Sequence, residues 1–271
     1  MAACYAERLP VCRPALNLVV AAARDGGALP PAIDAVFELG IDRFLTGRWD
    51  EAEQLVSEGL HWSEETGIAL LQSPGHWLRA LIAAGRGQYD RAEELTTSLR
   101  RWAAPRSAMA FARYAAHADA LAAAGRGDFE MAVVHASSIS RAGELQPHVP
   151  HALWVVLDLV EAAVRTGRHA DARAHVRAAQ ETGIAAISSR MNLLVTAAEA
   201  VAGVGDPLAS FRAALGADDV EIWSFDTARV RLLHGEELRS QGRTAEARAE
   251  LFVARQTFSA LDAAPVVRPR R

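Results

Sequence analysis

Cysteine is scarce in this 271-residue sequence, which contains only Cys4 and Cys12. Two cysteines without a C-x-x-C spacing exclude a disulfide-rich scaffold and favour a reducing, cytoplasmic location. Positive charge is not in excess either, because 29 Lys and Arg face 33 Asp and Glu, for a net charge of -4. No basic stripe is available to neutralise a row of phosphates, so we expect no nucleic-acid partner.

Long apolar runs are also missing from the sequence. The stretch ALNLVVAAA at 15–23 is too short to span a bilayer and lacks the flanks of a signal peptide. We expect this stretch to be a buried helix, and we expect the protein to have no membrane partner.

Common motifs of catalysis and nucleotide binding are absent, since G-x4-G-K-[ST], H-E-x-x-H and G-x-S-x-G do not occur. His148 and His151 lie three residues apart, but Pro150 stands between them and no third ligand is near. We therefore expect no metal site and no cofactor, and we expect a loop followed by a helix at this place.

An octet, GRGQYDRA at 85–92, returns forty residues later as GRGDFEMA at 125–132. Its core is a glycine followed five residues later by an alanine, and this pattern begins at Gly47, Gly87, Gly127, Gly167 and Gly242. The glycines are 40, 40, 40 and 75 residues apart, and a degenerate copy at Gly205 divides the last step. The result is six repeats of 37 to 40 residues, which indicates an architectural turn rather than a phosphate-binding loop.

Each repeat predicts two helices joined by a tight turn, because alanine-rich segments of helix length stand on both sides of the glycine. The glycine relieves a backbone with positive φ, and the alanine lets the two helices cross closely. One hairpin cannot bury its apolar faces alone, so neighbouring hairpins must stack. We expect an all-α fold of about six hairpins over 31–264, after a helix and cap at 1–30 and before a basic, frayed tail at 265–271.

The spacing of small and bulky residues resembles the tetratricopeptide repeat. Ala80, Gly87, Tyr89 and Ala92 stand at the intervals of that family's small residue, turn glycine, bulky residue and second small residue. The period here is longer than the family's 34 residues, and the bulky position is lost in the last two repeats. The resemblance implies a right-handed superhelical solenoid with a concave groove.

Residues 223–265 resemble the last repeat of large LuxR-type, MalT-like ATP-binding regulators, in which this segment leads into a helix-turn-helix domain. The ATPase motif and the DNA-binding domain of those regulators are both missing from this sequence. The resemblance implies the sensor or scaffold array of such a regulator, without its ATPase and without its DNA-binding domain.

The candidate site comes from aligning the repeats on their turn glycines. Positions 13, 10 and 6 before the glycine share one face of the first helix, which should line the groove. The early repeats place aromatic side chains there and the late repeats place polar ones, so the candidate ligand-binding residues are Phe37, Trp77, Tyr114, His117, Trp154, Glu161, Asn192, Glu199, Arg229 and Glu236. Aromatic walls with a few polar groups are typical of ligand sites. The alternative, that the tryptophans are core residues and the glutamates a solvated face, stays open.

Three functions fit this pattern. The leading one is a non-catalytic binding or sensor module that captures a small apolar or aromatic molecule, or a peptide, in the concave groove. The second is an enzyme that closes the groove into a pocket and uses an acid such as Glu161 or Glu199 for proton transfer or cyclisation. The third is a scaffold that holds a partner protein by a helix laid in the groove. The sequence leaves open the ligand, any catalytic residue and the oligomeric state.

Overall fold

The computed structural model describes residues 7–146 and 149–264, and the expected all-α fold is confirmed for this part of the chain. It holds fourteen α-helices with short 3-10 turns and no strand. No helix within these residues is both long and apolar enough to cross a membrane. His148, Cys4 and the basic tail at 265–271 lie outside the described residues.

The residues group into two compact units, each of which is described by itself. Unit 1 is Met1–Ala84 and Gln88–Ala118, and unit 2 is Gly85–Gly87 and Asp119–Arg271. The more detailed expectation, one continuous stack of six hairpins over 31–264, stays a prediction.

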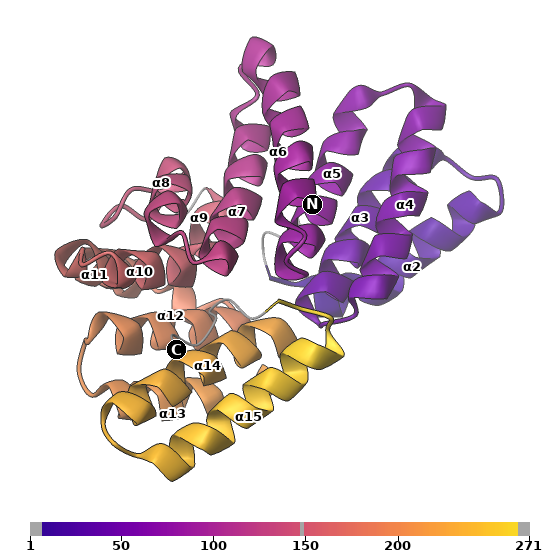
Figure 1. The fold of residues 1–271 in the computed structure, drawn as a ribbon. Coiled ribbons are helices and arrows are strands. Elements are labelled where there is room, and N and C mark those ends of the chain that lie inside the picture. Colours follow the sequence, from indigo (N-terminus) through magenta and orange to yellow (C-terminus); the bar gives the residue numbers. More distant parts are fainter. Residues whose placement is uncertain (1–6, 147–148, 265–271) are drawn as a thin grey trace. The chain divides into compact units, whose positions relative to one another are not determined.

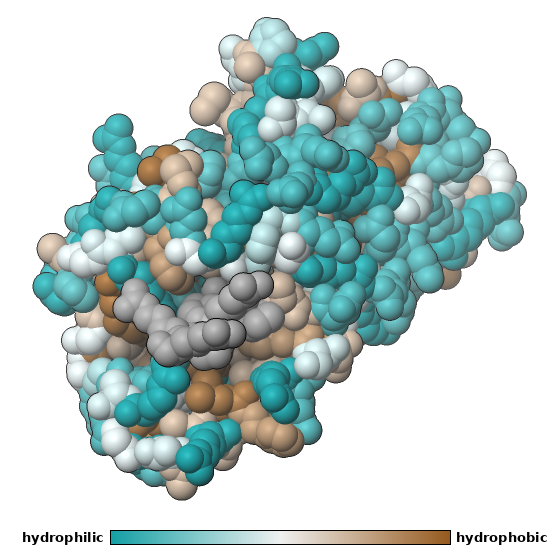
Figure 2. Space-filling model, viewed as in Figure 1, coloured by the Kyte–Doolittle hydropathy of each residue, from teal (hydrophilic) through white to brown (hydrophobic). Residues whose placement is uncertain are grey.

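Unit 1 is built around α3, which packs against α2 on one side and α4 on the other (Figure 1). Its helices are α2 (Leu9–Arg24), α3 (Leu29–Leu45), α4 (Trp49–Thr66), α5 (Ser73–Gly85), α6 (Tyr89–Ala103) and the first part of α7 (Met109–Arg126). Acidic Asp50 and Glu51 stand in the first turn of α4, where carboxylates favour the helix dipole. Over α4 and α6, the face shown in Figure 2 is mostly hydrophilic, because these helices turn their apolar stripes inward.

Unit 2 has α10 and α12 at its centre. The helix α10 packs against α8, α11 and α12, and α12 packs against α13 and α14, while α14 forms a pair with α15 (Figure 1). The helices that follow α7 are α8 (Phe129–Ile139), α9 (Pro150–Trp154), α10 (Val156–Arg165), α11 (His169–Thr182), α12 (Ser189–Ala202), α13 (Pro207–Leu215), α14 (Ser224–Ser240) and α15 (Thr244–Ala260).

The five repeated glycines adopt one backbone conformation, as the sequence predicts. Their φ angles lie between 73° and 79°, in Gly47, Gly87, Gly127, Gly167 and Gly242. The residue after the glycine donates its backbone N–H to a carbonyl five positions earlier, for example Arg168 to Ala163 at 2.7 Å. This bond closes the end of the first helix, and the left-handed glycine allows it without strain on a Cβ atom.

The small residues of the repeat lie at close helix crossings. The alanines five positions after the turn glycines are no more than 2% exposed, and they are Ala52, Ala92, Ala132, Ala172 and Ala247. A Cβ atom added to Gly235 of α14 would lie 2.7 Å from Cγ of Leu251 in α15, and one added to Gly40 would lie 2.9 Å from Cδ2 of Leu78. The predicted role of these positions in helix packing is confirmed.

Substitution of Ala132 by leucine should therefore overpack a helix crossing. We expect Ala132→Leu to lower the free energy of unfolding by about 1–3 kcal/mol, because Ala132 is fully buried. The measurement is urea denaturation followed by circular dichroism, with Ala170→Leu on the exposed side of α11 as the control. An equal change in the two variants would contradict the packing role.

The first helix of the fourth repeat, which ends before Gly167, is interrupted. It divides into α9 and α10 at Val155, whose ψ is 9°. Backbone hydrogen bonding continues through this point, since Val155 accepts from the N–H of Leu159 at 2.9 Å. The interruption is therefore a local change of ψ inside one helical element rather than a loop.

The fifth turn, between Gly167 and Gly242, is longer than expected. The first helix of this repeat ends at Gly203, which has a φ of 67°, and the N–H of Val204 donates to the carbonyl of Glu199 at 3.0 Å, as happens after Gly167. The second helix is capped by Asp206, the residue after Gly205. Two extra residues therefore lie in this turn, and every position counted back from Gly205 is displaced by two.

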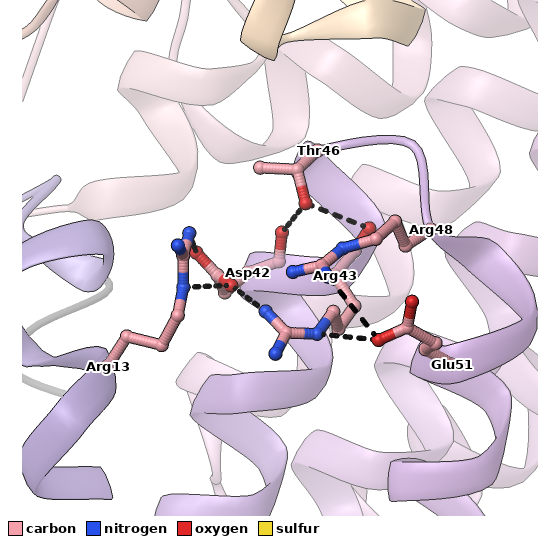
Figure 3. A network of polar contacts seen from close by, with 6 residues as sticks. All are labelled: Arg13, Asp42, Arg43, Thr46, Arg48 and Glu51. Atoms are coloured by element: carbon pink, nitrogen blue, oxygen red, sulfur yellow. Dashed lines mark hydrogen bonds and ion pairs between the residues drawn. The ribbon is translucent and has the colours of Figure 1, made fainter. Parts of the chain in front are cut away.

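The stretch at 15–23 is not a buried helix, and that expectation was wrong. It lies in α2, where Val20 and Ala23 are buried while Leu18 is 73% exposed. The physical reason is a polar contact, shown in Figure 3: Arg13 of α2 makes two hydrogen bonds of 2.9 and 2.8 Å with the buried carboxylate of Asp42 in α3. This contact turns the opposite, apolar face of α2 outward.

Candidate functional site

Three predicted aromatic residues meet in unit 1. The ring centroids of Trp77 and Tyr114 lie 4.8 Å apart at 21°, and those of Trp77 and His117 lie 5.9 Å apart. Trp77 is 1% exposed and Tyr114 is 4% exposed. The alignment brings the right residues together, but the indole and the phenol pack inside unit 1 rather than on its surface.

Phe37 and Trp154 are also interior residues. Cε1 of Phe37 fills a slot between helices that only glycines permit, because Cβ atoms at Gly59 and Gly75 would lie 2.5 and 2.6 Å from it. In unit 2, Trp154 is 5% exposed and lies edge-on to His151, with ring centroids 4.9 Å apart. The candidates with chemistry to offer are therefore the polar residues of unit 2.

A group of charged side chains runs through the interior of unit 2, and we call it the charge cluster. It consists of Asp158, Glu161 and Arg165 of α10, Arg190 of α12, and Asp226, Arg229 and Glu236 of α14. The chain contains no lysine, and the cations of the charge cluster are all guanidinium groups. Arginine suits this place because its planar fork can contact two carboxylates at once.

Arg229 is the centre of the charge cluster. Its Nη2 lies 2.8 Å from Oδ1 of Asp158 and 3.6 Å from Oε2 of Glu161, and all three residues are 5% exposed or less. Its Nε has no hydrogen-bond partner among the described residues. A second buried pair lies alongside, with Nε of Arg190 2.7 Å from Oδ2 of Asp226.

Arg165 and Glu236 form the solvent-facing rim of the charge cluster. Nη2 of Arg165 lies 3.3 Å from Oε1 of Glu161 and also donates to Oε2 of Glu236. The side chains of Arg165 and Glu236 are 28% and 21% exposed, so this edge is the one that solutes can reach. The pair joins α10 to α14 at a second point, beside the contact of Arg229 with Asp158.

Glu161 has the most altered electrostatic environment of the candidate carboxylates. Burial raises the pKa of Glu161 above its ordinary value, and the nearby Arg229 and Arg165 oppose that change. For Arg229, burial lowers the pKa, but Asp158 and Glu161 outweigh burial, so the net pKa is raised. Arg229 therefore stays charged, and Glu161 takes up a proton more readily than an exposed glutamate does.

The charge cluster carries one more acid than base. Four carboxylates face three guanidinium groups, so the fully ionised cluster has a net charge of one negative unit. An additional cation, or a proton on Glu161, would balance it. Chemically, the arrangement can bind a positive group or hold a proton near the rim.

Of the five polar candidates from the sequence, Glu161, Arg229 and Glu236 join the charge cluster and two do not. Glu199 accepts a hydrogen bond of 2.7 Å from Nε2 of Gln180 in α11, and Oδ1 of Asn192 accepts one of 3.4 Å from the hydroxyl group of Thr196 in the same helix. The cause is the longer fifth turn. Counted from Gly205, these two residues are assigned to a helix face that they do not share with the others.

Sequence reasoning missed Arg190, Asp158, Arg165 and Asp226. Arg190 stands thirteen residues before Gly203, the same distance that separates Arg229 from Gly242. Aligning the fifth repeat on Gly203 would have found it. Asp158 and Arg165 lie at other distances from Gly167, so the alignment does not select them. Their role becomes visible only in the structure, where long side chains from a neighbouring helix reach them.

His175 of α11 is a second buried ionisable group of unit 2. It is fully buried, and burial lowers its pKa from 6.5 to about 4, although the nearby backbone of Arg141 opposes this change. Because the folded pKa lies below the unfolded one, the contribution of neutral His175 is complete above pH 6.5 and is lost as the pH falls towards 4.

We therefore expect acid to lower the free energy of unfolding by about 3 kcal/mol through His175 alone between about pH 7 and pH 4. His175→Phe removes the titrating group and should flatten this dependence. The measurement is urea denaturation at several pH values, with the exposed His61→Phe as the control. If wild type and His175→Phe lose stability in parallel, His175 is not the titrating group.

No protein-family model, curated protein or solved structure matches this chain. Within 7–146 and 149–264, no group of three or more His, Cys, Asp and Glu residues is placed to hold a metal ion. The argument for function therefore depends on the charge cluster and on the repeat geometry.

Proposed function

We propose that this chain is a non-catalytic binding module, a right-handed solenoid of about six tetratricopeptide-like hairpins that captures a ligand along its first helices. Two observations support the repeat architecture: one backbone conformation at five turn glycines, and buried small residues at the matching crossings. Such arrays bind their ligands on the first helices, and the charge cluster lies on three of them. The resemblance to regulators of the LuxR type suggests a sensory role.

The ligand that we propose is a peptide or small molecule with a basic group. The single observation that carries this choice is the surplus carboxylate of the charge cluster, with Glu236 on the exposed rim and Glu161 buried next to it. A guanidinium or ammonium group of the ligand would contact these two glutamates and take over part of the role of Arg165. Binding a cation would also favour the ionised form of Glu161.

A peptide array tests this proposal. Each peptide is printed twice, once with arginine and once with citrulline, which has the same shape but no charge. We expect wild-type protein to bind a subset of arginine peptides at least about tenfold more tightly than their citrulline forms. Glu161→Gln should lose that preference, whereas Glu130→Gln, which removes an exposed ion pair with Arg168, should keep it.

Two results would count against a basic ligand. One is equal binding of arginine and citrulline peptides by the wild type, and the other is an unchanged preference in Glu161→Gln. A native mass spectrum of the purified protein complements the array, because it detects any small molecule that is retained during purification.

The enzyme alternative has one observation in its favour, the raised pKa of Glu161. A carboxylic acid that titrates closer to neutral pH can serve as a general acid or base. The enzyme alternative would be supported if the wild type converts a bound ligand and Glu161→Gln still binds that ligand but no longer converts it. Selection of long helical peptides, without a charge preference, would decide for the scaffold.

A further inference from the structure

The helix α2 has an apolar face that no described residue of unit 1 covers. Val11 and Leu18 are each 73% exposed, Val19 is 38% exposed, and Ala15 and Ala22 are also exposed. The residues Val11, Ala15, Leu18 and Ala22 follow one another at intervals of 4, 3 and 4, which places them in one stripe. The outward face of an outer helix in a soluble array is normally polar, so this stripe requires an explanation.

The rotation of α2 is fixed by two arginines on its other face. Arg13 makes two hydrogen bonds with Asp42 of α3, and Arg24 makes two with Glu58 of α4 at 2.8 and 2.7 Å (Figure 3 shows the former). The two arginines are eleven residues apart and therefore share a helix face. Both lie opposite the stripe, so α2 cannot turn its apolar residues inward without breaking both pairs.

No charged side chain interrupts the stripe. Between Leu9 and Ala23 the only charged residue is Arg13, which is engaged with Asp42. Arg8 before the helix and Asp25 after it are exposed and have opposite signs, while Arg24 lies on the other face and is paired with Glu58. The face is thus apolar along its length, positive at one end and negative at the other.

This pattern is complementary to itself under a two-fold axis. Consider two copies of α2 that pack antiparallel with the two-fold axis between residues 16 and 17. Each residue of one copy then meets the residue of the other copy for which the two residue numbers sum to 33. Val11 then meets Ala22 of the second copy, and Ala15 meets Leu18, so the two large side chains of the stripe, Val11 and Leu18, each face an alanine. The same pairing places Arg8 opposite Asp25 at both ends. An isologous contact requires this kind of self-complementarity.

We infer that a second copy of this chain covers the apolar face of α2, in an antiparallel helix pair. This inference is independent of the proposed function. One helix from each copy buries less surface than the roughly 1,600 Å² of a standard interface, so we expect a reversible dimer with a dissociation constant in the micromolar range. Large-to-small matching lets the helix axes approach closely, as small residues do at the crossings within each hairpin.

Sedimentation velocity of the full chain, from about 1 to 500 µM, tests the inference. Ala15→Leu places two leucines against each other, and Leu18→Ala leaves two alanines in contact. Each single variant should raise the dissociation constant at least about tenfold. The double variant exchanges the large and small positions, and it should return to within about threefold of the wild type. Because these side chains are exposed and both residue types favour helix, all three variants should fold, which circular dichroism checks.

Exchanging the charges at the two ends of α2 gives a second, independent test. Arg8→Glu and Asp25→Arg should each weaken the dimer, and the variant with both changes should recover it, since each charge again meets its opposite. Val134→Ala, which truncates a side chain that is 56% exposed on α8, is the control and should have no effect.

A wild type that stays monomeric over the whole concentration range would overturn the inference. So would tighter self-association of Ala15→Leu, which is expected of a non-specific apolar contact or of a face that serves another partner. Failure of the Ala15→Leu/Leu18→Ala double variant to recover dimerisation would reject the antiparallel register.

Discussion

Replacement of Arg229 by methionine is expected to lower the free energy of unfolding by about 3–5 kcal/mol. Methionine fills much of the same volume but leaves Asp158 and Glu161, which are 5% and 3% exposed, without their shared cation. Two buried carboxylates without a partner must either stay ionised at high cost or take up protons. The loss should therefore be largest at neutral pH and smaller in acid. Urea denaturation at pH 7 and at pH 5 measures the loss of stability and its dependence on pH.

The control for this experiment neutralises the acids as well. In an Arg229→Met background, Asp158→Asn and Glu161→Gln remove the buried charges, and we expect them to restore a large part of the lost stability. Arg239→Met, on the exposed side of α14, should change the free energy of unfolding by less than about 0.5 kcal/mol. If Arg229→Met behaves like Arg239→Met, the charge cluster is not an electrostatic unit.

Replacement of Trp154 by alanine is expected to cost about 3–5 kcal/mol of stability, because the indole is 5% exposed and packs against His151. The sequence suggested that Trp154 contacts the ligand, and this variant separates the two roles. Where Trp154 is purely a core residue, the variant unfolds at lower urea concentration while affinity per folded molecule is unchanged.

Trp102→Ala in unit 1 serves as a control, since that side chain is only half-buried and should cost less. Loss of binding by a Trp154→Ala protein that keeps its denaturation midpoint would assign the indole to the ligand instead. Binding is measured with the arginine peptides that the array selects.

The turns could be predicted from the sequence because one chemical requirement fixes them. Only glycine adopts a φ near 75° without strain, so the recurrence of glycine at one period reveals the backbone itself. Alanine at the helix crossings is equally informative, since a buried crossing admits little else. The all-α class and the positions of Gly47 and Gly167 follow from these two facts.

The candidate site could be predicted only in part, because its register depends on one turn. Two extra residues around Val204 shift the fifth repeat, so the alignment selects Asn192 and Glu199 in place of Arg190. Burial was equally hard to foresee. A tryptophan such as Trp77 has the same sequence pattern whether it lines a groove or fills the core, and only the packing of neighbouring helices decides between these.

The face of α2 was misjudged because apolar composition does not reveal which side of a helix is covered. The stretch at 15–23 has the composition of a buried helix. Its orientation is decided by the contact of Arg13 with Asp42, which are 29 residues apart in the sequence. Long-range polar contacts of this kind have no local pattern.

The most direct test of the binding proposal is the titration of the Glu161 carboxyl group, observed by carboxyl-carbon NMR and assigned by comparison with Glu161→Gln. In the free protein, the pKa should lie above its ordinary value because the group is buried. On saturation with an arginine peptide selected by the array, the pKa should fall, since an adjacent cation favours the carboxylate. An unchanged pKa in the bound protein would contradict the assignment of Glu161 to the ligand site.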